Sequence, residues 1–319
     1  MNPLLQVQNL GVTYHSPHGE VNLLEKVSFS VEPEEIFALV GESGSGKTTL
    51  ACALTRLFPT ATNLKITGRV LFDDIEISDL GEQELQRVRK ERIRYVFQEP
   101  SRSLNPVAPI RRQLLLASVR RQKTSRDNEM IDASLKQVGI EQPEEILRAY
   151  PHQLSVGTLQ RITIAMALLS SPKLLIADEP TTAVDAPLRH QILELLNSLR
   201  RTLGVSILLI THDLEAVRQH ADRIAVLYAG RLVELAPREA FLRNPLHPYS
   251  QMLLKCSVLS ASSLDTIPSV LGSAPSPISL PSGCKFHPRC FKVQKGCSVE
   301  EPDLALVGSE RLLRCPYWK

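Results

Sequence analysis

Aromatic residues, net charge and long apolar runs are all scarce in this chain of 319 residues. Aromatic side chains make up 5% of the sequence, and 37 Lys and Arg against 34 Asp and Glu leave a net charge of +3. Proteins that bind nucleic acids concentrate basic charge on one face and often stack bases on aromatic rings, so we expect no nucleic acid partner. Apolar runs stay below the roughly 18 residues of a membrane-spanning helix, because positions 170–173 interrupt the longest run, residues 162–177.

The N-terminus lacks the basic start and the apolar core of a secretory signal. We therefore expect a soluble, cytoplasmic protein whose membrane contacts are made through a partner. Hydrophobic residues make up 43% of the chain and charged residues 22%, near the average of globular proteins. The length corresponds to about two domains.

Short apolar runs alternate with helical patterns along most of the chain, which predicts a parallel α/β sheet. Residues 105–169 are predicted to be mostly helical, with polar breaks near 123–128 and 141–145, and have the character of an insertion. Residues 257–283 are rich in Ser and Pro and indicate an extended linker. Strands are expected at 4–7, 27–31, 36–40, 93–97, 173–178, 205–210, 223–228 and 231–234, and helices at 47–57, 187–203 and 214–220.

Residues 41–48 read Gly-Glu-Ser-Gly-Ser-Gly-Lys-Thr and match the phosphate-binding P-loop pattern. The loop follows a predicted strand and precedes a predicted helix, which is the context that the pattern requires. Lys47 can neutralise the β- and γ-phosphates of ATP, and the Thr48 hydroxyl can bind Mg²⁺. Loop amides and the helix N-terminus favour the same anion. The predicted nucleotide contacts here are Gly41, Ser43, Gly44, Ser45, Gly46, Lys47, Thr48 and Thr49.

A second acidic site for the metal follows at residues 174–179, Leu-Leu-Ile-Ala-Asp-Glu. Four apolar residues predict a buried strand, and its carboxyl end is where open α/β sheets bind ligands. Asp178 would hold Mg²⁺ through water. Glu179 would polarise the attacking water as a general base.

Further motifs occur in a specific order. Gln98 follows one predicted strand and His212 another. Residues 154–157, Leu-Ser-Val-Gly, precede a predicted helix, and residues 183–185, Ala-Val-Asp, follow the acidic strand. With the P-loop, this series over about residues 4–240 resembles an ATP-binding-cassette (ABC) ATPase.

The resemblance implies a fold and a set of roles. The fold is an α/β P-loop NTPase with a RecA-like core, an antiparallel β subdomain and a helical insert at about residues 104–169. This domain would span residues 1–243, and a small extension would follow at 244–319. The residues implied as catalytic are Glu179, His212 and Gln98, and those implied at Mg²⁺ are Thr48, Gln98 and Asp178.

Tyr14 stands where an aromatic ring stacks on adenine in this family. An ordinary strand aromatic is the alternative, because the segment 14–21 is longer than a tight turn.

The family forms head-to-tail dimers in which each ATP lies between one P-loop and the partner's signature motif. Residues 154–157 match this signature, so Ser155 and Gly157 would serve the partner's nucleotide. Residues 183–185 match the family's D-loop, and Asp185 is implied there as a nucleotide-binding residue. In this chain Val156 replaces a glycine of the usual Leu-Ser-Gly-Gly-Gln signature. A β-branched residue disfavours positive φ and occupies space. Two outcomes stay open: a slow or inactive partner site, or a tolerated substitution.

The C-terminal sequence narrows the resemblance. Residues 244–254 and 280–290 resemble segments that follow the ATPase domain in dipeptide, oligopeptide and nickel importers, and residues 164–168 look like the first of their two paired ATPases. Cys284, Cys290, Cys297 and Cys315 are separated by five, six and seventeen residues. Structural zinc usually shows a closer cysteine pair, and the resemblance implies that some members carry a [4Fe-4S] cluster. A cluster, zinc and free thiols all stay open, and a structural role is favoured over a redox role because the tail is small.

These observations predict an ATP-hydrolysing subunit of a peptide-type ABC importer at the cytoplasmic face of the inner membrane. It would form a heterodimer with a second ATPase and dock on two integral-membrane permeases through about residues 99–115. An extracytoplasmic solute-binding protein would deliver the solute. The alternatives are a nickel or other small-solute importer of the same family, a non-transport ABC ATPase and a regulatory nucleotide-binding module.

Overall fold

A computed structural model describes residues 2–17, 19–59, 63–118, 125–182, 184–260 and 272–318. The chain divides into two compact units, which are described separately. The first unit comprises Met1–Glu32, Phe37–Asp79 and Ile210–Lys319. The second comprises Pro33–Ile36 and Leu80–Leu209.

An antiparallel sheet in the first unit has the strand order β2-β1-β4-β5. Its strands are β1 (Leu5–Ser16), β2 (Gly19–Val31), β4 (Leu64–Phe72) and β5 (Ile75–Glu76). Tyr14 lies directly opposite Val21 in the β1–β2 ladder, which continues to the pair Ser16 and Gly19. The expected long loop at 14–21 is therefore wrong, because both strands run on to a tight hairpin.

The second set of strands in the first unit has the order β11-β12-β10-β9-β3. β3 pairs with β9 in parallel, whereas the β9–β10, β10–β12 and β11–β12 pairs are antiparallel. The sequence predicted a parallel sheet, and this prediction is wrong for these three strand pairs. The strands are β3 (Ile36–Val40), β9 (Arg223–Tyr228), β10 (Arg231–Pro237), β11 (Ala305–Val307) and β12 (Arg311–Leu313). The helices of this unit are α1 (Lys47–Leu54), η1 (Ile77–Asp79), α9 (Leu214–His220), α10 (Arg238–Arg243), α11 (Pro248–Ser260), η3 (His287–Arg289) and η4 (Lys295–Ser298).

Aromatic residues join the C-terminal extension to this sheet. Tyr228 of β9, Phe241 of α10, Tyr249 of α11 and Phe286 are all buried in one hydrophobic cluster. The Tyr228 ring centroid lies 4.6 Å from that of Tyr249 and 5.1 Å from that of Phe286. The cassette and its extension therefore share one core within the first unit.

A buried carboxylate reinforces this junction. Glu234 of β10 has no exposed surface, and it accepts hydrogen bonds from the backbone amides of Leu246 at 3.0 Å and His247 at 2.9 Å. The Arg311 guanidinium of β12 lies 3.5 Å away. Burial raises the pKa of Glu234, and the amide donors oppose that rise.

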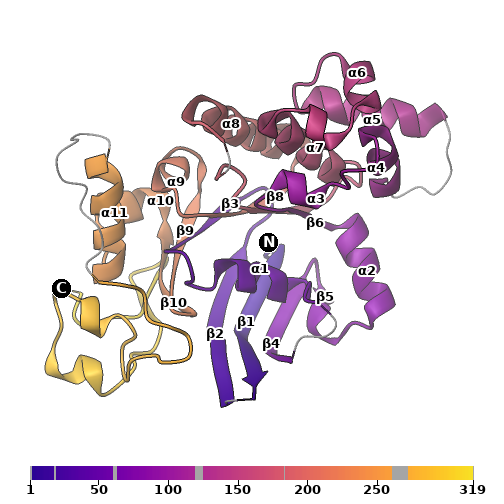
Figure 1. The fold of residues 1–319 in the computed structure, drawn as a ribbon. Coiled ribbons are helices and arrows are strands. Elements are labelled where there is room, and N and C mark those ends of the chain that lie inside the picture. Colours follow the sequence, from indigo (N-terminus) through magenta and orange to yellow (C-terminus); the bar gives the residue numbers. More distant parts are fainter. Residues whose placement is uncertain are drawn as a thin grey trace. The chain divides into compact units, whose positions relative to one another are not determined.

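The second unit holds the helical insert. Its strands β6 (Ile93–Val96) and β7 (Leu174–Asp178) pair in parallel, and β7 lies beside β8 (Ser206–Thr211), which continues into the first unit. Figure 1 shows α4 to α7 gathered into one group. The helices are α2 (Glu82–Glu91), α3 (Pro100–Ser103), α4 (Ile110–Ala117), α5 (Ser125–Gln137), α6 (Pro143–Arg148), η2 (Pro151–Gln153), α7 (Val156–Leu168) and α8 (Ala186–Leu203).

The predicted polar breaks and linker differ from the structure. Helix α6 begins inside the break expected at 141–145, because Pro143 and two glutamates suit a helix N-terminus. Helix α5 begins at Ser125, within the break expected at 123–128. Helix α11 extends to Ser260, inside the predicted linker. Of the rest of that linker, residues 261–271 lie outside the described residues, and 272–283 contain no helix or strand.

The described part of the chain contains no candidate membrane-spanning helix. None of its helices combines the length and the apolar character that crossing a bilayer requires.

Candidate functional site

The P-loop of the first unit curves tightly between β3 and α1. All five residues of β3 are buried, which fixes the start of the loop. Gly46 is the N-cap of α1 with φ of 104°, a left-handed conformation that favours glycine. A Cβ atom on Gly41 would lie 2.3 Å from the Leu227 backbone oxygen. Glycine at this position is therefore required by the close approach of β9.

Lys47 is 5% exposed and points back into the loop. Its ammonium group donates to the carbonyl oxygens of Gly41 and Glu42, each at 2.9 Å. A buried cation beside the N-terminus of α1 favours an anion, so the loop is electrostatically suited to phosphate. The side chain of Ser45 is buried, and its backbone oxygen accepts from the Gly230 amide at 2.9 Å.

The remaining P-loop residues and two further predicted residues also belong to the first unit. Ser43, Gly44 and Thr48 are exposed, and Thr49 is half-buried. Tyr14 is half-exposed on β1. His212 is exposed and directly follows β8.

The acidic residues lie in the second unit, at the end of β7. Asp178 is 3% exposed, and its Oδ2 atom accepts a hydrogen bond from the Tyr95 hydroxyl at 2.8 Å. Tyr95 of β6 stands opposite Ile176 in the parallel ladder, so its phenol reaches the end of the neighbouring strand. Sequence analysis missed Tyr95. The available signal was a polar tyrosine within the strand predicted at residues 93–97.

Glu179 has φ of 46°, an unusual conformation for a residue other than glycine. Its Oε2 atom accepts from the Gln98 amide at 3.2 Å and from the Thr182 hydroxyl at 2.7 Å. The structure therefore brings Gln98 and Glu179 together. It also places Thr182 in contact with Glu179, and the sequence motifs did not predict this contact. A carboxylate fixed by two donors is oriented to accept a proton from water.

The signature motif starts helix α7. Ser155 is the N-cap, and its hydroxyl accepts from the Thr158 amide at 3.2 Å. Val156 is the first residue of the helix, is 43% exposed and does not have positive φ. The expected conflict with positive φ is therefore wrong in this chain, because Val156 lies within the first turn of α7 and does not need positive φ.

The signature and D-loop are neighbours within the second unit. A Cβ atom on Gly157 would lie 2.2 Å from Leu188 Cδ2 of helix α8. Asp185 is the N-cap of α8 and accepts from the Leu188 amide at 3.1 Å. Ala183 of the predicted D-loop lies outside the described residues.

The predicted ATP-site residues are thus divided between the units. Those of the first unit are Tyr14, residues 41–49 and His212, and those of the second are Gln98, Ser155, Gly157, Asp178, Glu179 and Asp185.

All four C-terminal cysteines line one cavity of about 280 Å³ in the first unit. Backbone amides donate to two of the sulfurs: Lys292 to Cys290 and Gln294 to Cys297, both at 3.4 Å. Burial raises the pKa of the Cys284, Cys290 and Cys315 thiols.

Two histidines also line this cavity. His247 is buried, and desolvation lowers its pKa to about 3, so its imidazole is neutral at physiological pH. The Nδ1 atom of His287 lies 2.9 Å from the Cys284 oxygen, within a short turn, as expected for a turn residue.

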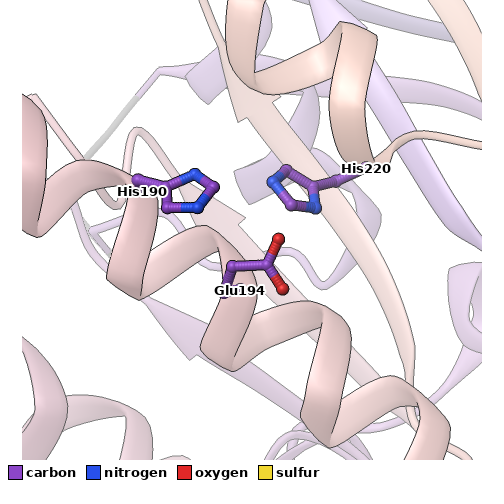
Figure 2. Close-up of side chains that lie close together, drawn as sticks. All are labelled: His190, Glu194 and His220. Atoms are coloured by element: carbon purple, nitrogen blue, oxygen red, sulfur yellow. The ribbon is translucent and has the colours of Figure 1, made fainter.

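Helix α8 carries two further side chains of types that can bind ligands or transfer protons. His190 and Glu194 lie one helical turn apart, are both exposed and project from the same side of α8 (Figure 2). His220, also drawn there, ends α9 and belongs to the first unit. None of the sequence motifs includes these residues.

A P-loop at a helix N-terminus, a buried strand ending in Asp-Glu and a serine-capped signature helix define an ATP-binding-cassette ATPase. Residues 24–182 match the ABC transporter family, and residues 233–297 match the oligopeptide/dipeptide transporter C-terminal region.

Relatives extend this match to almost the whole chain. The oligopeptide transport ATP-binding protein AppD of Bacillus subtilis is 38% identical over 99% of this chain and 97% of its own length. The oligopeptide transport ATP-binding protein OppD of Escherichia coli is 40% identical over 94% of this chain and 89% of its own. The chain belongs to the ABC transporter family, among the ATP-binding proteins that carry this C-terminal region.

A solved structure agrees with the assignment. The dimeric ATP-binding cassette MJ0796, in a post-hydrolysis state with ADP and phosphate, is 28% identical, has a TM-score of 0.64 and covers 73% of this chain and 98% of its own. The predicted fold class is confirmed.

Substitution of Gly41 tests the P-loop geometry. Gly41→Ala places Cβ against a backbone oxygen that cannot rotate away, so we expect ATP affinity to fall by more than about tenfold, the equivalent of 1.4 kcal/mol. Titration calorimetry of the purified protein measures this. Gly308→Ala is the control, because Gly308 also has positive φ but meets nothing within 4 Å. Equal ATP affinity in the two variants would contradict the geometry.

Proposed function

We propose that this chain binds and hydrolyses ATP to energise the import of oligopeptides or dipeptides. The observation that carries the proposal is the presence, in one chain, of a complete set of ATPase motifs and an oligopeptide-transporter C-terminal region. The names of AppD and OppD, which match nearly end to end, support peptides as the solute class. Nickel or another small solute is the alternative within the same family.

The chain's own residues suit hydrolysis of the ATP on its P-loop. Lys47 would neutralise the β- and γ-phosphates, while Thr48 and Asp178 would hold Mg²⁺. The bound Mg²⁺ would offset charge on the phosphates. The Tyr95 hydroxyl donates to the Asp178 carboxylate at 2.8 Å and would hold it in a fixed orientation as a ligand.

Glu179 would act as the general base in this reaction. Water attacks the γ-phosphorus, the bond to the β–γ bridging oxygen breaks, and Glu179 takes the proton of the attacking water. Gln98 would orient this carboxylate and contact Mg²⁺, and His212 would contact the γ-phosphate. The hydrogen bonds from Gln98 and Thr182 support the orientation of Glu179.

A second ATPase would complete each ATP site. Ser155 and Gly157 at the start of α7, with Asp185 at the start of α8, would meet the partner's nucleotide. Val156 fits a regular helix start, which supports a tolerated substitution and a working partner site. Tyr14 on β1 would stack on the adenine of this chain's own ATP.

Permease docking would use the surface around α3 and α4. Val107 between these helices is 82% exposed, and Phe97 and Leu116 are also exposed apolar side chains. Exposed apolar groups in one region favour a protein partner. We place the subunit at the cytoplasmic face of the inner membrane, bound to two permeases served by an extracytoplasmic solute-binding protein.

For the cysteine cavity we propose an iron–sulfur group rather than zinc. Tetrahedral zinc, with Zn–S bonds of about 2.3 Å, draws its sulfurs within roughly 4 Å of one another. All four cysteines are described, and no three of their sulfurs gather within 4.8 Å. A cluster is larger and tolerates irregular cysteine spacing. We propose that Cys284, Cys290, Cys297 and Cys315 hold a [4Fe-4S] cluster that supplies structural cross-links.

Purification tests the importer assignment. We expect the tagged chain, extracted from native membranes with mild detergent, to carry two permeases and a second, non-identical ATPase, identified by mass spectrometry. Recovery only from the soluble fraction, without a permease, would favour a non-transport ABC ATPase instead.

The role of Glu179 is tested in the purified complex. Removing the base should lower ATP turnover by about 10²-fold or more, so we expect Glu179→Gln to abolish most phosphate release while ATP binding persists. Glu129→Gln, which alters an exposed carboxylate of α5, should leave turnover unchanged. Unchanged turnover in Glu179→Gln would make this chain a regulatory nucleotide-binding module.

Metal analysis tests the cysteine site. Anaerobically purified protein should contain about four irons per chain and absorb visible light. Cys290→Ser should lose both signals, whereas Cys256→Ser should keep them because Cys256 lies outside the cavity lining. One zinc per chain, or no metal, would refute the cluster.

A further inference from the structure

Arg289 of the C-terminal extension forms a two-pronged ion pair with the P-loop. Its Nη1 and Nη2 atoms donate to the two carboxylate oxygens of Glu42 at 2.7 Å and 2.9 Å. These residues are 247 positions apart in the sequence. The Arg289 side chain is only 7% exposed. A shielded, bidentate pair fixes both partners in direction as well as in distance.

Every polar group of Glu42 is engaged in this arrangement. The Glu42 amide donates to the Tyr249 hydroxyl at 2.8 Å. Its carbonyl oxygen accepts from the Lys47 ammonium at 2.9 Å and from the Ser45 amide at 3.2 Å. Glu42 therefore joins two residues of the extension, Arg289 and Tyr249, directly to the lysine expected to bind phosphate.

Both anchors are themselves held firmly. Tyr249 is completely buried against Tyr228 and Phe286, and burial raises the pKa of its phenol. The Arg289 guanidinium lies 5.8 Å from the Tyr228 ring centroid, within the range of a cation–π contact. Movement of either anchor would disturb this shared aromatic core.

The turn that carries Arg289 also contributes residues to the cysteine cavity, among them His287 and Cys290. Arg289 ends the short helix η3, and Cys290 is the next residue. Two backbone hydrogen bonds close the turn. The Arg289 amide donates to the Phe286 carbonyl oxygen, and the His287 amide donates to the Cys284 carbonyl oxygen, each at 3.0 Å. Two of the four cavity cysteines thus flank the turn that aims Arg289 at Glu42.

We infer that Arg289 and Tyr249 are positioning residues for the P-loop, and that the state of the four-cysteine cavity sets ATP affinity through them. When the cysteines are held together, η3 keeps Arg289 on Glu42, and the carbonyl oxygen of Glu42 keeps Lys47 in place. When the cysteines separate or are modified, that constraint on the P-loop is lost. The inference rests on the proposed binding of ATP to this P-loop.

Reciprocity gives the inference a second observable. If opening of the cysteine cavity changes ATP affinity by some factor, ATP must change the equilibrium constant for opening the cavity by the same factor. ATP should therefore protect the cavity cysteines from chemical modification, although they are not expected to touch nucleotide.

The first experiment measures ATP affinity by titration calorimetry on the intact complex. Arg289→Met should raise the Kd for ATP at least tenfold, and Arg289→Lys should raise it less. Arg69→Met is the matched control, because Arg69 forms an equally bidentate pair with Glu76, at 2.7 Å and 2.6 Å, in the β4–β5 ladder of the same unit. Equal Kd values for Arg289→Met and Arg69→Met would overturn the inference.

The second experiment follows alkylation of Cys290 by iodoacetamide with mass spectrometry, with and without ATP. ATP should slow alkylation in the wild type and in Arg69→Met, but not in Arg289→Met or Tyr249→Phe. Tyr249→Phe retains the aromatic core and so reports on the hydroxyl contact if Arg289→Met does not fold.

The possible failures are distinguishable. A wild-type complex that does not bind ATP overturns the proposed function together with the inference. A wild-type complex that binds ATP but shows the same Cys290 alkylation rate with and without it overturns the inference alone.

Discussion

The constraint on which the nucleotide end of the first unit depends is the burial of a positive charge. Lys47 is almost fully enclosed, and a cation so placed is stable only where oxygen atoms surround it. The carbonyl oxygens of Gly41 and Glu42 supply that environment, which requires the chain to double back sharply after β3. The close approach to β9 at Gly41 and the left-handed turn at Gly46 follow from this reversal. The same reversal leaves the start of α1 able to meet phosphate.

The acidic residues of the second unit follow a different principle, in which polar neighbours set the direction of carboxylates. Asp178 is oriented by a tyrosine from the adjacent strand, and Glu179 by an amide and a hydroxyl. Each of these donors is neutral. The two carboxylates are thus aimed by hydrogen bonds while their negative charge stays available for a metal ion and a proton.

Sequence patterns correctly predicted those structural features that are determined by residues close together in the sequence. The P-loop, the buried strand before Asp178 and the capped start of α7 each lie within a few residues, so turn chemistry and periodicity define them. The loop expected at residues 14–21 was wrong because hairpin length depends on strand pairing, which a single strand does not reveal. The contact between Arg289 and Glu42 joins residues 247 positions apart, and no spacing rule reaches that far. The gathering of four irregularly spaced cysteines likewise needed the folded extension.

The fully buried Glu234 also bears on how such a protein can be shortened. Its hydrogen-bond donors are the amides of Leu246 and His247, and Arg311 of β12 lies beside it. A cassette truncated after α10 would keep the carboxylate and lose all three partners, leaving an uncompensated charge inside the sheet. The extension is therefore an integral part of this unit, and a minimal ATPase cut from the chain would need a neutral residue at position 234 before its fold could be compared with the intact subunit.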